Sequence, residues 1–120
     1  MKNKEVVVKF YEEVFNAWDT TKINRYMRED YLQHNPTVED GREGFVRFCD
    51  QFFSLHPHME IIRIIEEGDF VVVFFKCTVD MGVNKVCDIY RLQDGLLAEH
   101  WDVVQRLDPE QIPVNGNGQF

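Results

Sequence analysis

The sequence predicts an α+β fold, in which helices come first and an antiparallel sheet follows. Before Pro57, apolar residues recur at the helical spacing of about 3.6 residues. After His58 the chain becomes dense in valine, isoleucine and phenylalanine, and turn residues separate these runs, as is typical of strands. A chain with this order packs its helices against one face of the sheet.

The first expected helix runs from Lys4 to Trp18. One side of it is apolar, and charged and polar residues line the other side. The apolar stripe consists of Val7, Phe10, Tyr11, Val14 and Trp18. The sequence DTTK ends this helix, and the segment from Lys22 to Met27 is expected to form a short second helix.

A third helix is expected to begin after Asp40. Asp40 followed by Glu43 is a variant of the capping box, in which two side chains satisfy free amide groups at a helix start. Pro57 ends this helix. Its apolar stripe consists of Phe45, Phe48, Cys49 and Phe52.

The rest of the chain is expected to form a meander of long strands. The strands are residues 58–67, 69–80, 84–92 and 96–106. Strands this close in sequence pair antiparallel, because a parallel pair needs a long crossover. Strands of about ten residues extend about 33 Å, and a sheet of that length twists and curls. We therefore expect a cone, with three N-terminal helices packed in the concave face of a curved antiparallel sheet of four long strands.

The length of 120 residues predicts one domain that spans residues 1–120. Its last part, residues 108–120, contains two prolines and two glycines and is expected to be an extended tail. We expect this tail to dock on the domain, with Phe120 as an apolar plug near the pocket or a partner subunit.

The charge balance excludes several function classes. With 13 basic and 21 acidic side chains the net charge is -8, which repels the phosphates of nucleic acids.

The start of the chain returns to charged residues after three valines, unlike a signal peptide, and no stretch approaches the ~20 apolar residues that cross a bilayer. We therefore expect a cytoplasmic protein that neither binds nucleic acid nor enters a membrane.

The three cysteines, Cys49, Cys77 and Cys87, cannot all pair, and each lies in an apolar segment. We expect reduced, mostly buried thiols rather than nucleophiles.

The last hairpin allows two registers. A two-residue turn at Asp94–Gly95 would place Leu92 opposite Leu97, and Asp88 would then share a face with Trp101. A three-residue loop that includes Gln93 would instead place Leu92 opposite Leu96. We favour this second register, because it collects four polar side chains on one face and leaves the large apolar ones on the other. The four are Asp88, Tyr90, His100 and Asp102, with Asp88 opposite His100.

A buried carboxylate is costly unless it is paired or protonated, so such a cluster indicates a functional site. The alternative is that Asp88 and Asp102 face water on an exposed side of the sheet.

His56 and His58 could bind a metal, but no further ligand follows at a suitable spacing, and we expect no metal site. Lys76 could be an amine nucleophile, although an edge lysine is the simpler interpretation.

The segment YLQHNP places Gln33, His34 and Asn35 in what reads as a loop. These side chains either satisfy a polar turn or form a wall of hydrogen-bond donors in a pocket.

The sequence contains no phosphate-binding glycine loop, dinucleotide fingerprint or nucleophile elbow. We therefore expect no cofactor.

Three motifs resemble the SnoaL-like proteins of the nuclear transport factor 2-like superfamily. The first runs from Asp88 through Arg91 and Asp94–Gly95 to Glu99–Asp102 and resembles a D-x-x-R-x-x-D-G-x-x-x-E-H-W signature. The second, Tyr31–Pro36, resembles a Y-x-Q-H-N-P run. The ending NGNGQF is similar to that of a bacterial branch of predicted aldol-condensation enzymes.

The resemblance implies a cone-shaped fold, commonly a homodimer through the sheet. It also implies chemistry without metal or Schiff base, in which an aspartate acts as acid and base in an intramolecular aldol condensation. That aspartate falls on Asp102, with Asp88 as a second polar residue of the pocket. The chain is shorter than typical antibiotic cyclases, which favours a smaller substrate.

Together these observations predict removal of a proton from a carbon next to a carbonyl group. Asp102, or Asp88 with His100, would be the base, and His34, Asn35 or Gln33 would donate to the enolate oxygen. The expected ligand is a small apolar or carbonyl-containing molecule. The expected walls are Phe10, Trp18, Phe48, Phe52, Phe74 and Tyr90. The alternatives are a binding module without turnover and a structural homodimer of the same fold.

Overall fold

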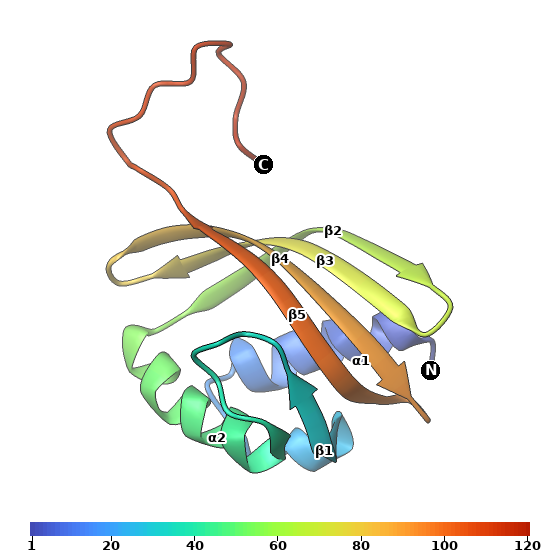
Figure 1. Cartoon of the computed structure of the whole chain (residues 1–120). Coiled ribbons are helices and arrows are strands. Elements are labelled where there is room, and N and C mark those ends of the chain that lie inside the picture. Colours follow the sequence, from blue (N-terminus) through green and yellow to red (C-terminus); the bar gives the residue numbers. More distant parts are fainter.

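A five-stranded sheet curves over two helices in the computed structural model, which describes residues 1–120 (Figure 1). The spatial order of the strands is β1-β5-β4-β3-β2. Both helices lie on one side of the sheet, and the chain after β5 leaves on the other side (Figure 1). The elements are α1 (Asn3–Phe10), β1 (Met27–Gln33), α2 (Gly41–Phe52), β2 (His58–Glu67), β3 (Phe70–Val79), β4 (Gly82–Gln93) and β5 (Leu96–Arg106).

The first helix is shorter than predicted. α1 ends at Phe10, and a π-helical turn, Tyr11–Phe15, continues it. A π turn adds a residue per turn, so the apolar stripe shifts, and Phe15 rather than Trp18 takes the next core position. Phe15 is buried, whereas Trp18 is 46% exposed.

The second expected helix and the four-stranded sheet were wrong in detail. Between Lys22 and Met27 there is only a short 3-10 turn, Ile23–Arg25. The fifth strand, β1, follows it directly. β1 lies parallel to β5, with Leu32 opposite Glu99 and Gln33 opposite His100. This parallel pair is possible because α2 and three strands lie between its members in the chain.

α2 begins after Asp40, as predicted, but the capping box does not form. The Asp40 side chain makes no cap hydrogen bond. Its Oδ1 instead accepts a hydrogen bond from the backbone N–H of Gln33 (2.8 Å), which ties the end of β1 to the start of α2. A 3-10 turn, Phe53–Leu55, ends the helical segment ahead of Pro57.

The last hairpin uses neither predicted register along its whole length. Asp94 and Gly95 both have positive φ, and Leu92 faces Leu97, so the turn has two residues and the preferred three-residue loop was wrong. Ala98 is then an extra residue in β5, because Leu92 pairs with Leu97 while the preceding Arg91 pairs with Glu99.

This bulge returns the polar residues to one face. Beyond it Tyr90 lies opposite His100, and Asp88 lies opposite Asp102 rather than His100. The predicted grouping of Asp88, Tyr90, His100 and Asp102 is therefore present, although a different backbone device produces it.

The tail, residues 107–120, contains no helix or strand. The Phe120 ring lies 6.0 Å from that of Phe74, and the Lys76 ammonium lies 5.7 Å from the Phe120 ring. Both contacts are on the face of the sheet opposite the helices, because the alternate residues Val73, Phe75 and Cys77 are buried. Neither helix has the length and the apolar composition of a membrane-spanning segment.

Candidate functional site

A cavity of about 130 Å³ lies between α2 and the inner face of the sheet. Most of its lining is apolar, and Phe48 and Phe52 of α2 belong to that part as predicted. Its polar side is built mainly from the end of β1 and from β4 and β5. The polar residues used below are Tyr31, Gln33, Asn35, Asp88, His100 and Asp102.

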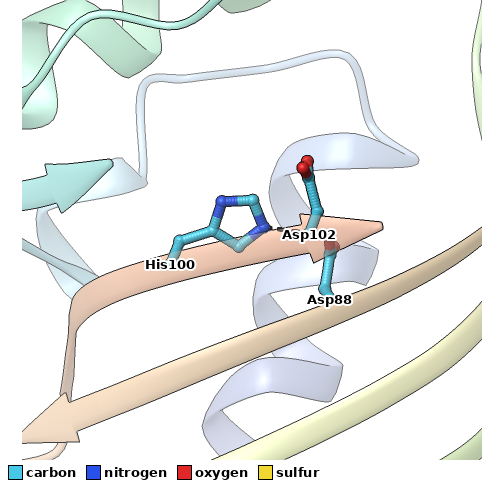
Figure 2. A group of neighbouring side chains, drawn as sticks. All are labelled: Asp88, His100 and Asp102. Atoms are coloured by element: carbon cyan, nitrogen blue, oxygen red, sulfur yellow. Dashed lines mark hydrogen bonds and ion pairs between the residues drawn. The ribbon is translucent and has the colours of Figure 1, made fainter. Parts of the chain in front are cut away.

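Asp88 is a buried carboxyl group with three hydrogen-bond partners in this site. It lies on β4 beside His100 and Asp102 of β5 (Figure 2). Its Oδ1 lies 2.9 Å from His100 Nε2, and its Oδ2 accepts hydrogen bonds from the hydroxyls of Tyr90 (3.1 Å) and Tyr11. Asp88 is only 5% exposed and His100 only 7%, so this pair is closed off from bulk water.

The contacts of the other ring nitrogen of His100, Nδ1, show whether that nitrogen carries a hydrogen. Nδ1 lies 2.7 Å from Gln33 Oε1. That oxygen also accepts the backbone N–H groups of His34 (3.1 Å) and Asn35 (3.0 Å), so it is the acceptor and Nδ1 carries the hydrogen. A hydrogen bond between Nε2 and Asp88 then requires one proton shared by the pair. The site therefore stores a proton between Asp88 and His100.

Asp102 is held in a different way. Both of its oxygens face the amide nitrogen of Asn35, at 3.1 and 2.9 Å. The amide oxygen of Asn35 accepts from the backbone N–H and the hydroxyl of Thr37, which fixes the orientation of the amide. One neutral amide nitrogen is thus the only partner of Asp102, and lone pairs of this carboxylate remain free on the cavity side.

Asp88, His100 and Asp102 could together hold a cation, since one ligand atom of each lies within 4.8 Å of the others. Asp88 and His100 already use these atoms in hydrogen bonds with each other and with neighbouring side chains. A cation would have to displace those bonds, so the arrangement suits proton transfer better than metal binding. His56, considered for a metal site, instead pairs with Asp80 at the surface (2.7 Å).

His34 does not lie in the cavity, contrary to the prediction. Side chains alternate along an extended chain, so Gln33 points inward and His34 outward. The His34 ring stacks on Trp101 at 4.7 Å, and its Nε2 lies 2.7 Å from Glu99 Oε2. His34 and Arg91 together lower the pKa of Glu99 from its ordinary value.

Three predicted wall residues also lie elsewhere. Trp18 lies beyond the end of the helical segment, in a turn with positive φ, and its indole N–H donates to the carbonyl of Pro57 (2.7 Å). Phe74 lies on the outer face of the sheet against Phe120, and Lys76 lies on the same face. Phe10 is fully buried in the core and does not line the cavity.

Tyr31 lines the cavity but was not predicted as a site residue from the sequence. It is 2% exposed, and its pKa is raised well above the ordinary value, first by burial and then by the charges of Asp88 and Asp102. The signal that could have found it was alternation. If residues 27–33 are taken as a strand, Tyr31 and Gln33 fall on the same face.

Cys77 also lines the cavity. Burial, with a further contribution from Asp88, raises the pKa of its thiol to about 11. Cys77 is therefore a neutral thiol at neutral pH rather than a nucleophile, in line with the expectation from sequence.

Solved structures share this architecture. A proposed polyketide cyclase from Acidithiobacillus ferrooxidans superposes with a TM-score of 0.77 at 19% identity, covering 88% of this chain and 89% of that chain. IdmH, a proposed polyketide cyclase from Streptomyces antibioticus, gives 0.74 at 16% identity, covering 87% and 92%. An NTF2-like protein of unknown function from Cytophaga hutchinsonii gives 0.73 at 14% identity, covering 88% and 91%.

Among curated proteins no sequence matches significantly. The family model for the SnoaL-like domain matches residues 7–100, which contain both halves of the Asp88–His100 pair and the YLQHNP segment. The fold is that of the NTF2-like proteins, and the protein belongs to the SnoaL-like domain family.

Proposed function

We propose that the protein is a cofactor-free acid/base catalyst that acts on a small carbonyl compound, in a reaction of the aldol-condensation, cyclase or isomerase type. The observation that carries this proposal is the Asp102 carboxylate, which lines a largely apolar cavity with one neutral amide as its partner. A carboxylate in such surroundings can accept a proton from carbon. The likeness to proposed polyketide cyclases supports the same reaction class.

In the proposed reaction Asp102 removes a proton from the carbon next to the carbonyl group. Asn35 keeps the carboxylate in place, since Thr37 fixes its amide. The Asp88–His100 pair lies within 4.8 Å of Asp102 and holds a further proton. This proton can stabilise the protonated form of Asp102 or exchange with the proton that Asp102 has taken up. General acid/base catalysis of this kind contributes typically about 10² to 10⁴-fold to a rate.

The volume of the cavity limits the substrate. At about 130 Å³ it is smaller than the ~300 Å³ at the low end of common ligand pockets. A compound of a few non-hydrogen atoms, or one end of a longer molecule, fits this space. Phe48 and Phe52 favour an apolar body next to the carbonyl group.

Exchange of α-hydrogens into cyclopentanone in heavy water, followed by proton NMR, tests the proposal. The wild-type protein should accelerate the exchange, and Asp102→Asn should lower the added rate by about 10²-fold or more. Asp50→Asn removes an equal charge from an exposed position of α2 and should leave the rate unchanged. Equal rates for Asp102→Asn and wild type would remove Asp102 from the mechanism.

A binding module without turnover is the second candidate, because the cavity has mostly apolar walls. It predicts that cyclopentanone binds to the protein while the exchange rate stays that of the buffer. The exchange measurement therefore separates the two functions.

We further propose a homodimer formed through the outer face of the sheet, working in the cytoplasm. Ile65, Phe70 and Val103 leave apolar surface exposed on this face, at 57%, 42% and 70%. Sedimentation equilibrium should give the mass of two chains, and Val103→Glu should give that of one. A wild-type mass of one chain would refute the dimer.

A further inference from the structure

We propose that Tyr31 donates the hydrogen bond that holds the substrate carbonyl oxygen and stabilises the enolate formed when Asp102 removes the proton. This inference rests on the proposed function and adds a catalytic residue to it.

The Tyr31 hydroxyl is unusual among the phenols of this chain, because no acceptor of the protein takes its hydrogen and only the Gln33 amide, a donor, is near enough to act on it. Tyr11 and Tyr90 both donate to Asp88, and Tyr26 donates to Glu13. Yet Tyr31 is only 2% exposed, between Tyr11 and Tyr90 at 1% and Tyr26 at 4%. A buried phenol usually finds a partner inside the protein.

The free hydroxyl faces the cavity. Every fully enclosed side-chain oxygen and nitrogen of the structure has a hydrogen-bond partner. Since the Tyr31 hydroxyl has no acceptor and Tyr31 lines the cavity, its oxygen must touch the cavity space rather than lie sealed in the core. The Tyr31 ring stacks beside that of His100, with ring centres 6.5 Å apart and planes 21° apart, which limits where the hydroxyl can point.

The surroundings keep this phenol protonated. Burial raises its pKa most, the charges of Asp88 and Asp102 add to that effect, Cys49 adds a smaller part, and the Gln33 amide opposes it. Tyr31 is therefore a neutral O–H donor at neutral pH. Tyr31 and Asp102, the proposed base, line the same cavity.

Gln33 supplies a second donor. Its Oε1 is fully used by His100 and two backbone N–H groups, whereas its amide nitrogen lies beside the Tyr31 hydroxyl and donates to no other group of the chain. A carbonyl oxygen between Tyr31 and Gln33 would meet both donors, while the adjacent C–H would face the free lone pairs of Asp102.

The proposed step balances without any further reactant. The C–H bond breaks, the proton moves to Asp102, and the electron pair of that bond forms the C=C bond of the enolate. The carbonyl oxygen gains negative charge, and its hydrogen bond from Tyr31 strengthens. Donors aimed at such an oxygen are each worth about 10² to 10³-fold in rate.

The test uses cyclopentanone and reads two signals from each protein variant. The first is the change in the carbonyl carbon NMR shift on binding, which reports hydrogen bonds to the ketone oxygen whether or not it reacts. The second is α-hydrogen exchange in heavy water. Tyr31→Phe should lose most of the downfield binding shift and about 10² to 10³-fold of the exchange rate. Tyr26→Phe, a matched phenol removal at a residue that does not line the cavity, should keep both.

The two readouts separate the inference from the proposed function. A binding shift that depends on Tyr31 but comes without exchange would support Tyr31 as the carbonyl donor and refute the catalytic function. Exchange that persists unchanged in Tyr31→Phe, with the full binding shift, would overturn the inference and leave the catalytic function standing. A wild-type protein that gives no binding shift at all would overturn the inference directly.

Discussion

Asp88 stands out at the scale of single residues, because three hydrogen-bond partners surround one buried carboxyl group. Tyr11, Tyr90 and His100 come from the N-terminal helical segment and two neighbouring strands, so this carboxyl group ties them together. A buried acceptor of this kind is expensive to leave unpaired. The same contacts that hold the pair in the cavity therefore also hold the fold together.

Removing the Tyr11 hydroxyl should cost stability, and removing that of Tyr31 should not. Tyr11→Phe takes a donor away from buried Asp88, and we expect the free energy of unfolding to fall by about 1 to 3 kcal/mol. Tyr31→Phe removes a hydroxyl without an acceptor, so its effect should be near zero. Urea unfolding of both variants measures this difference, and equal losses would contradict the assigned hydrogen bonds.

The candidate site was predictable in part from the sequence. Asp88, His100 and Asp102 could be grouped because alternation along β4 and β5 places them on one face. His34 could not be placed, because its direction depends on whether the segment around it is extended or turns. The same missing information concealed Tyr31, which stands three residues earlier.

At the scale of elements, β1 is the strand that the sequence did not reveal. Its seven residues, MREDYLQ, include only three apolar side chains, and neither a helical nor a strict alternating pattern is evident. What makes it a strand is its distant partner, since β5 supplies the hydrogen bonds along one edge. Local patterns carry no information about such a partner, whereas the hairpins could be found because their turns are local.

The turn of the last hairpin offers a test of the backbone device that aligns the site. Gly95 has a φ of +76°, and a side chain added there would meet nothing within 4 Å. Gly95→Ala should therefore lower the free energy of unfolding only through backbone strain, by about 1 to 2 kcal/mol. Asp94→Asn is the control, because asparagine also tolerates the left-handed conformation.

Thermal or urea unfolding of the two turn variants gives the comparison. Wild-type stability in Gly95→Ala would mean that the turn is not the two-residue type described above.

At the scale of the whole molecule, folding raises the pKa of all four tyrosines. The pKa of Tyr26 is raised to about 12, mainly by burial and by Glu13, and those of Tyr11, Tyr31 and Tyr90 are raised well above 10. The folded protein thus keeps phenol protons that an unfolded chain releases near pH 10. This contribution to stability is fully present below pH ~10 and is lost as the pH rises above it.

An alkaline titration should therefore show one event. Tyrosinate absorbance should stay low while the protein is folded and then rise together with the loss of circular dichroism, at a pH above 10. Separate ionisation of single tyrosines near pH 10, with the fold intact, would contradict the burial of these phenols.

The parallel contact between β1 and β5 also sets the order in which the molecule can assemble. Gln33 and His100, which meet in the site, are 67 residues apart in the chain. Contacts of such long range form late, because the chain must first lose the conformational entropy of a large loop before these contacts stabilise it. During synthesis the helices and the first hairpins can collapse early, but the proton-holding pair must wait for β5. The cavity is therefore among the last features of this domain to form as the chain leaves the ribosome.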